Sequence, residues 1–415
     1  MAEFINKNGS LGPLHIKEFR LHIISRFFYT MALRMVTTVV AYKLFQLTQS
    51  SFSIGLVGLS EFIPVFSLAL YAGHVIDRTD KRTMLLNNIL LYGLCVIALI
   101  IITSSYIESN ISTLMLEVSF YLIIFFSGIT RAFAGPTSSA IISQLVPRNV
   151  LHYAANISSS TWLSASIAGH ASAGFFIAWF GVHGTFYIVL AYVLVSALVF
   201  SSVKRKPAAV TDLSQKTWAS VKEGLKYIQS NKILLGAISL DLFAVLFGGA
   251  VALIPEFAIK ILQVGPIGFG WLNAATDMGA VTMIILVTVF PMKKNQGKIL
   301  MTAVAGFGIT ILVFGLSTIF WISFFALLIG GMLDGISVII RNTVLQLTTP
   351  DNMRGRVASV NSMFVNSSNE LGQFESGVTA RLMGASPAVL FGGTMTLIVV
   401  IISWFKAPSL RKFEY

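Results

Sequence analysis

Two apolar runs with a charged loop between them decide the fold at residues 54–104, which read IGLVGLSEFIPVFSLALYAGHVIDRTDKRTMLLNNILLYGLCVIALIIITS. The runs are Ile54–Gly73 and Met84–Ser104. Each holds about 20 mainly apolar residues, which is the length that an α-helix needs to cross the hydrocarbon core of a bilayer. We therefore predict two membrane-spanning helices joined by a short basic loop.

The composition extends this interpretation to the whole chain of 415 residues. The chain is 55% hydrophobic and 11% charged, and its mean hydropathy is +0.80. A soluble protein carries about 25% charged residues, because its surface must be hydrated. The length suits about twelve spans with short loops and leaves no room for a separate soluble domain. We expect an all-α membrane protein.

Six apolar runs precede a polar stretch and six follow it. The expected spans are Phe19–Phe45, Ile54–Gly73, Met84–Ser104, Leu114–Gln144, Asn156–Phe180, Thr185–Val203, Ile233–Lys260, Gly268–Phe290, Ile299–Thr318, Trp321–Leu347, Val357–Met383 and Ala388–Phe405. The chain then divides into an N-terminal six-helix bundle at residues 1–203, a cytoplasmic linker at 204–232 and a C-terminal six-helix bundle at 233–415. In the linker, Trp218, Val221, Leu225 and Ile228 recur at helical spacing. That pattern predicts an amphipathic helix on the inner leaflet.

Basic residues concentrate in alternate loops. They are Arg78, Lys81 and Arg82; Arg148; Lys204, Arg205 and Lys206; Lys293, Lys294 and Lys298; and Arg354 and Arg356. Loops rich in Lys and Arg stay in the cytoplasm, so we place both termini there. Topology also accounts for the net charge of +12, and we expect no nucleic-acid partner.

The two halves repeat each other. Pro147-Arg148-Asn149 corresponds to Pro350-Asp351-Asn352, and the same offset pairs Gly128 with Gly331 and Arg131 with Asp334. The fourth and tenth spans are therefore equivalent elements of two pseudo-symmetric bundles. Parallel repeats of this kind place a transport site at their interface.

The loop after the second span carries a recognisable spacing of Gly73, Asp77, Arg78, Lys81 and Arg82. This spacing resembles the loop motif of the major facilitator superfamily. The resemblance implies the twelve-helix major facilitator fold and a transporter that works by alternating access, with this loop as a conformational switch.

The chemistry of the loop fits that role. Gly73 allows a tight turn at a helix end. Asp77 suits a helix N-terminus or an arginine across the seam between the halves. The basic side chains hold the loop at the anionic inner leaflet. Asp80 departs from the motif, where the family has glycine more often, and we expect a differently capped turn there.

Further stretches resemble the branch that contains enterobactin exporters and macrolide efflux proteins. They are Asp241…Phe247-Gly248-Gly249…Pro255-Glu256-Phe257-Ala258, Pro350-Asp351-Asn352-Met353-Arg354-Gly355-Arg356-Val357, and Asn361…Asn369-Glu370-Leu371-Gly372…Glu375-Ser376-Gly377. The resemblance implies a monomeric, multi-pass protein of the bacterial cytoplasmic (inner) membrane. It also implies proton-driven export of a siderophore or drug-like molecule.

One element typical of antiporters is altered. The fifth span of many of them carries Gly-Pro-x-x-Gly-Gly, whereas this chain reads Gly169-His170-Ala171-Ser172-Ala173-Gly174. The small residues that let helices pack closely remain. His170 replaces the proline and is either a titrating group or a packed neutral side chain. The change supports an alternative, a proton-coupled uptake symporter.

Charged side chains inside the spans are the candidates for chemistry, because a charge at mid-bilayer costs at least ~2.5–3.5 kcal/mol. Asp241, Asp334 and Glu370 are the candidates for proton coupling, in that order. A carboxyl group holds a proton more tightly when it is desolvated and less tightly when an arginine approaches. The alternative is a static ion pair that fixes the packing of the helices.

Six residues are candidates for the cavity and the substrate: Arg34, Glu61, Arg131, Asn366, Asn369 and Gln373. The three amides could equally make hydrogen bonds between helices. Because Arg131 and Asp334 are equivalent in the repeat and opposite in charge, we expect them to belong to one charge system across the cavity.

Other functions lack a motif. The chain has no phosphate-binding loop, no cluster of metal ligands and no nucleophile–base pattern, and we expect neither an enzyme nor a cofactor. The single cysteine, Cys95, excludes an intramolecular disulfide. The expected partners are a small-molecule substrate, protons and the lipid bilayer. A membrane sensor or assembly partner on the same fold is a further alternative.

Overall fold

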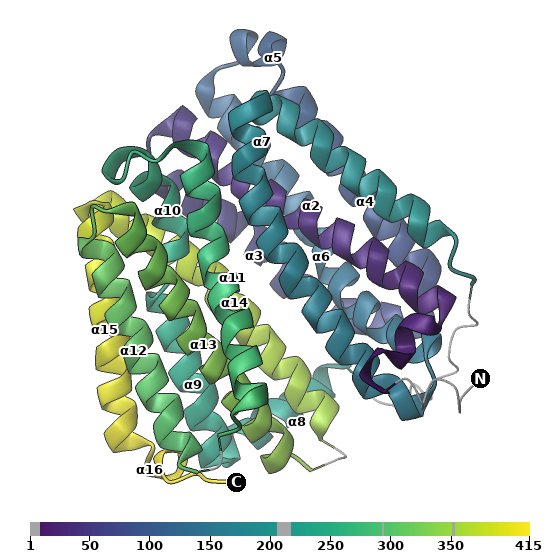
Figure 1. The fold of residues 1–415 in the computed structure, drawn as a ribbon, viewed down its shortest axis with the longest axis vertical. Coiled ribbons are helices and arrows are strands. Elements are labelled where there is room, and N and C mark those ends of the chain that lie inside the picture. The colour runs from purple at the N-terminus through teal and green to yellow at the C-terminus, as the bar shows by residue number, and fades with distance from the viewer. Residues whose placement is uncertain (1–8, 206–216, 293, 351–352) are drawn as a thin grey trace. The chain divides into compact units, whose positions relative to one another are not determined.

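The computed structural model describes residues 9–205, 217–292, 294–350 and 353–415, and these residues are helical with short connections (Figure 1). The elements are η1 (Gly9–His15), α2 (Lys17–Thr48), α3 (Ser51–Arg78), α4 (Lys81–Ile102), α5 (Ser105–Asn110), α6 (Thr113–Leu145), η2 (Arg148–Val150), α7 (Leu151–Ser201), α8 (Thr217–Ser230), α9 (Lys232–Phe247), η3 (Ala250–Leu253), α10 (Ile254–Glu256), η4 (Phe257–Ile261), α11 (Gly265–Val289), α12 (Gln296–Leu316), α13 (Phe320–Thr348), α14 (Arg354–Met383), α15 (Ala385–Lys406) and α16 (Pro408–Arg411). No strand occurs among the described residues.

Ten helical stretches in the described part of the chain are long and apolar enough to cross a membrane. They are α2, Ser51–Ala69 of α3, α4, α6, η2 with α7, Lys232–Ile261, α11, α12, α13 and α15. The all-helical membrane architecture predicted from the apolar runs is therefore confirmed. Helices satisfy every backbone hydrogen bond internally, which is what a bilayer requires of a spanning segment.

The predicted fifth and sixth spans are joined without a loop. Helix α7 runs over 51 residues and is interrupted at Gly181, whose φ is 69° and ψ is 177°. Glycine adopts this conformation readily because it has no Cβ. One residue therefore makes the break that we had expected residues 181–184 to make, and helical segments 151–180 and 182–201 follow each other directly.

The predicted seventh span, Ile233–Lys260, is not one continuous helix. Helix α9 ends at Phe247, and η3, α10 and the π-helical turn η4 follow it. A Cβ on Gly249 would lie 2.6 Å from the carbonyl oxygen of Gly372 in α14. The helix is thus interrupted where two backbones approach closely, which only glycine permits.

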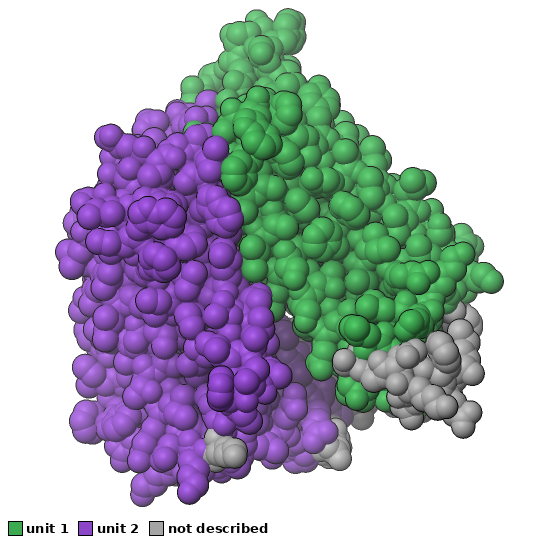
Figure 2. All heavy atoms as spheres, viewed as in Figure 1, with its two compact units in different colours: residues 1–43, 63–213 green, residues 44–62, 214–415 purple. Residues whose placement is uncertain are grey.

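The chain forms two compact units, residues 1–43 with 63–213 and residues 44–62 with 214–415, coloured separately in Figure 2. We call them unit 1 and unit 2. The end of α2 and the start of α3 belong to unit 2. Ser51 Oγ donates a hydrogen bond of 2.5 Å to Glu256 Oε2, and Lys260 Nζ donates one of 3.1 Å to the Gln49 carbonyl. The division at residues 203 and 233 stays a prediction.

Helix α8 packs on protein, which corrects the expectation that its apolar side rests on lipid. Ile228 is 1% exposed and belongs to the hydrophobic core of unit 2. A Cβ on Gly224 would lie 2.9 Å from the Arg356 carbonyl oxygen, so α8 and α14 are in close contact. Arg356 also pairs with Glu223 at 2.6 Å. The side chain of Trp218 lies outside the described residues.

Candidate functional site

A buried ion pair joins α9 to α13 in unit 2. Arg341 donates a hydrogen bond to Asp241 Oδ2, and their side chains are 10% and 5% exposed. Asn231 caps the start of α9 by accepting hydrogen bonds from the backbone N–H groups of Ile233 and Leu234. Asp241 is the tenth residue of this helix and lies roughly 14 Å along it, at 1.5 Å per residue.

Asp334 belongs to the same charge cluster. It lies seven residues before Arg341 on α13, about two turns, and so on the same face of the helix. On the same helix, Ser337 Oγ and Arg341 Nε are buried without a hydrogen-bond partner among the described residues. Arg341 therefore pairs with Asp241, and a second acid, Asp334, lies on the same face of α13.

Glycines set the position of α13. A Cβ on Gly331 would lie 2.0 Å from the Thr276 carbonyl oxygen of α11, and one on Gly279 would lie 1.9 Å from the Leu328 carbonyl oxygen. The two backbones approach as closely as small-residue contacts between membrane helices allow. This contact fixes the height of Asp334 and Arg341 relative to the rest of unit 2.

The polar helix α14 brings together two of its four predicted site residues. Gln373 Nε2 donates a hydrogen bond of 3.1 Å to Glu370 Oε2. A Cβ on Gly58 would lie 3.0 Å from the Glu370 carbonyl oxygen, so the start of α3 lies against this contact. Glu61 of α3, also in unit 2, is buried. The other two predicted residues, Asn366 and Asn369, are exposed.

Arg34 is the central charged residue of α2 in unit 1. Its guanidinium lies 4.9 Å from the ring centre of Trp162 on α7. One turn further, Thr38 Oγ1 and His170 Nδ1 form a hydrogen bond of 2.7 Å. His170 is 8% exposed, so it is a packed side chain with a polar partner. Arg131 of α6 is partly buried in the same unit.

A second polar contact in unit 1 escaped the sequence analysis. Arg26 of α2 donates a hydrogen bond of 2.6 Å to Ser138 Oγ of α6. Arg26 Nε and both ring nitrogens of His22 are buried without a hydrogen-bond partner. The charge of Arg26 inside a predicted span could have indicated this contact. Nothing in the sequence pattern pointed to Ser138 or His22.

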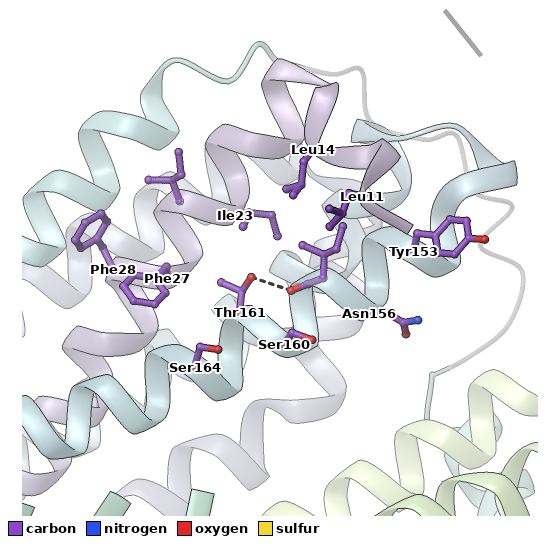
Figure 3. Close-up of a pocket in the computed structure, with 12 residues that line it drawn as sticks. Leu11, Leu14, Ile23, Phe27, Phe28, Tyr153, Asn156, Ser160, Thr161 and Ser164 are labelled. Carbon is purple, nitrogen blue, oxygen red and sulfur yellow. Dashed lines mark hydrogen bonds between the residues drawn. The ribbon is translucent and has the colours of Figure 1, made fainter. Parts of the chain in front are cut away.

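Unit 1 also contains a groove that no motif predicted (Figure 3). Its volume is about 620 Å³. Apolar side chains of η1 and α2 face polar side chains of α7 across it, and the lining includes Leu11, Leu14, Ile23, Ile24, Phe27 and Phe28 on one side and Tyr153, Asn156, Ile157, Ser160, Thr161 and Ser164 on the other. None of the predicted site residues lines this groove.

The predicted switch loop is shorter than expected. Helix α3 continues to Arg78, so Gly73 lies inside the helix and does not form the turn, which corrects that expectation. Asp80 caps α4 by accepting hydrogen bonds from Arg82 N at 3.1 Å and Thr83 Oγ1 at 2.6 Å. An N-cap favours Asp over Gly slightly, which explains the departure from the motif. The side chain of Asp77 lies outside the described residues.

Arg82 ties the loop to the end of α7. Arg82 Nε donates a hydrogen bond of 2.9 Å to the Val203 carbonyl, and its Nη2 donates one of 2.5 Å to the Ser201 carbonyl. These carbonyls lie at the C-terminal end of α7, where a cation is favoured by the helix dipole. Lys81 is buried at the first position of α4.

A multi-pass helical membrane protein whose spans carry buried ionisable side chains belongs to the class of membrane transporters, because such residues mark substrate and ion pathways. The sequence profile of a family described as transmembrane secretion effector matches residues 8–414. The chain therefore belongs to this family of the major facilitator superfamily. It is a secondary transporter rather than an enzyme.

Its relatives include efflux proteins. The chain is 24% identical over 382 residues to the uncharacterized MFS-type transporter YfiS of Bacillus subtilis, a match that covers 89% of this chain and 88% of the relative. It is 22% identical over 390 residues to the multidrug efflux pump Tap of Mycolicibacterium fortuitum, which covers 91% and 93%. It is 22% identical over 396 residues to the enterobactin exporter EntS of Shigella flexneri, which covers 95% and 93%.

Solved structures support the fold. A D-xylose–proton symporter matches with a TM-score of 0.75 at 12% identity, over 96% of this chain and 99% of the other. The nucleoside transporter NupG matches with a TM-score of 0.68 at 15% identity, over 95% and 98%. At these identities the likeness shows the fold alone.

Proposed function

We propose that this protein exports a small organic molecule in exchange for protons by alternating access. The observation that carries the proposal is the buried ion pair of Asp241 and Arg341, with a second acid, Asp334, two turns from Arg341 on the same face of α13. A merely structural ion pair needs one acid for one arginine. The second acid gives the cluster a site that can gain and lose a proton.

The exchange follows from the chemistry of this cluster. A proton that enters from the outer side neutralises Asp241, and Arg341 then pairs with Asp334. When the site faces the cytoplasm, Arg341 returns to Asp241 and the proton is released there. An approaching arginine favours the charged carboxylate, and its departure favours the protonated form. Glu370, hydrogen-bonded to Gln373, is the third candidate for this role.

The direction and the substrate class rest on the relatives. An enterobactin exporter and a multidrug efflux pump share over 90% of the length of this chain, so we propose export of a siderophore or drug-like molecule. The cavity residues in this proposal are Arg34, Glu61, Arg131, Asn366, Asn369 and Gln373.

The topology that we propose has twelve spans in two six-helix bundles, the two termini in the cytoplasm, and a monomer in the bacterial inner membrane. The ten apolar stretches, the break of α7 at Gly181 and the 30-residue polar helix α14 support this number. Reporter fusions after Glu108 should report the periplasm and fusions after Lys206 the cytoplasm. The opposite pattern would overturn the orientation.

The switch loop is a part of the same proposal. We expect Asp77→Asn to impair transport while the protein still folds, because Asp77 would stabilise one of the two access states. Arg78, Lys81 and Arg82 would hold the loop at the membrane surface. Full transport by a normally expressed Asp77→Asn protein would remove Asp77 from the mechanism.

Vesicle transport tests the function directly. Labelled probes, a siderophore and a macrolide, are added outside everted and right-side-out vesicles, with and without an imposed proton gradient. Export predicts gradient-driven accumulation in everted vesicles only. Accumulation in right-side-out vesicles would instead support the uptake symporter, and the absence of gradient-dependent movement of a broad set of organic probes would support a sensor or assembly partner.

A further inference from the structure

The guanidinium of Arg34 lies at mid-helix with an aromatic neighbour and, in the described part of the chain, no acidic partner. Arg34 is the eighteenth of the 32 residues of α2, so it lies far from either end of the span. Its guanidinium stacks on Trp162. Among the described residues, it makes neither a hydrogen bond nor an ion pair. Trp162 is 36% exposed, so the rest of the protein leaves part of its ring uncovered.

The neighbouring residues hold the Arg34 side chain in place. A Cβ on Gly169 would lie 2.8 Å from Arg34 Cβ and 2.8 Å from the Met31 carbonyl oxygen, so α7 approaches α2 here as only glycine permits. Thr38 donates a hydrogen bond of 3.0 Å to the Arg34 carbonyl and is itself hydrogen-bonded to His170. The helix crossing therefore fixes the base of the Arg34 side chain.

The charge balance of unit 1 supports a ligand of negative charge. Arg26, Arg34 and Arg131 lie inside its spans, whereas its acidic residues in the helices all lie within five residues of a helix end. A cation in this position does not face hydrocarbon, because the bilayer disfavours it strongly. A position beside a polar space would lower this cost and would attract an anion.

We propose that Arg34 and Trp162 bind the carboxylate-bearing aromatic part of the transported molecule. The inference rests on the proposed function and adds the class of substrate, an aromatic organic anion. A guanidinium binds a carboxylate through two parallel hydrogen bonds and stacks on aromatic faces at the same time. The exposed part of the Trp162 ring extends the stack to the aromatic group of the ligand.

Direct binding to the purified full-length protein in detergent tests the proposal. The probes are 2-naphthoate, its uncharged analogue 2-naphthamide, and benzoate, each titrated calorimetrically. We expect naphthoate to bind about ten-fold or more tightly than naphthamide, since a hydrogen bond to a charged group is worth more than a neutral one. Benzoate should bind more weakly than naphthoate because it covers less of the ring.

Variants locate the site. Arg34→Gln should weaken naphthoate binding about ten-fold or more and leave naphthamide binding unchanged, which also reports that the variant is folded. Arg34→Lys should fall between them, because lysine keeps the charge but loses the planar fork. Trp162→Leu should weaken both probes. The matched control is Trp179→Leu, which changes an exposed tryptophan on the same helix and should have no effect.

Several results would overturn the proposal. They are equal affinity for naphthoate and naphthamide, no naphthoate binding by the folded wild-type protein, or an unchanged affinity in Arg34→Gln and Arg34→Lys. Chloride that competes as well as naphthoate would also count against it, since it would show a site for simple anions. The Asp241→Asn variant separates this proposal from proton-driven export, because it should lose gradient-driven transport and still bind naphthoate.

Discussion

The contact between Arg26 and Ser138 in unit 1 and the contact between Asp241 and Arg341 in unit 2 occupy equivalent places. Arg26 and Asp241 are each the tenth residue of their helix, α2 and α9. Ser138 and Arg341 are related by the same offset that aligns Pro147 with Pro350. The polarity differs: a cation meets a neutral hydroxyl in unit 1, whereas an acid meets an arginine in unit 2.

This difference teaches that the repeat preserves the geometry of a helix contact while its charge diverges. Unit 1 carries Arg26, Arg34 and Arg131 inside its spans, and unit 2 carries Asp241, Asp334 and Glu370. A cationic set suits an anionic substrate and an acidic set suits protons. We therefore propose that unit 1 binds the anionic substrate and that unit 2 carries the protons.

The largest effect is expected from Asp241→Asn. The variant should lose gradient-driven efflux to the level of vesicles without the protein, because the amide cannot carry the proton. Substrate exchange without a gradient should remain. The control Asp277→Asn changes an acid of α11 in the same unit and should keep most of the gradient-driven efflux. If Asp241→Asn still drives efflux, the carrier lies elsewhere and Asp334→Asn is the next variant.

The second effect separates a paired charge from an unpaired one. Arg341→Gln should lower the free energy of unfolding by about 3–5 kcal/mol, because it leaves the buried Asp241 without its cation. Arg26→Gln, at the equivalent contact, should lower it by about 1 kcal/mol, because it removes a cation that has no acid partner. Denaturation by SDS in mixed micelles measures both.

The double variant Asp241→Asn/Arg341→Gln is the control for this pair. It should recover most of the stability that Arg341→Gln loses, because the carboxylate that pairs with Arg341 is removed as well. Equal losses in Arg341→Gln and Arg26→Gln would mean that the two contacts do not differ in the way that their charges suggest.

The third effect concerns the helix crossing that holds Arg34. Gly169→Ala should lower the free energy of unfolding by about 1–3 kcal/mol, because the added methyl group meets Arg34 Cβ and the Met31 carbonyl. Gly135→Ala in α6 is the matched control, since nothing lies within 4 Å of its Cβ position, and it should be neutral or stabilising by up to about 1 kcal/mol. An unchanged stability of Gly169→Ala would show that α2 and α7 separate at no cost.

The smallest effect is the coupling between Arg131 and Asp334, the equivalent residues of opposite charge. A double-mutant cycle of Arg131→Gln and Asp334→Asn should give a coupling free energy of about 1 kcal/mol in stability, and non-additive losses in transport. If the two charges interact, each single variant would leave the other charge without its partner. Strict additivity in both measurements would refute a shared charge system.

The sequence by itself determined the class of protein and the residues that carry charge into the membrane. An apolar run such as Met84–Ser104 indicates a helix surrounded by lipid. The run alone is enough to predict the span, because the bilayer acts on each helix separately. The repeat of Pro147 and Pro350 was visible for the same reason, since it is a matter of order along the chain.

Only the tertiary structure decided which of these residues meet. Asp241 and Arg341 are 100 residues apart, and the sequence pattern of neither helix predicts that these two residues pair. The end of α9 at Phe247 and the place of Ile228 in the core depend in the same way on α14 and on the neighbouring helices. Burial and pairing are properties of two packed surfaces, so they follow from the arrangement of distant segments rather than from the composition of either one.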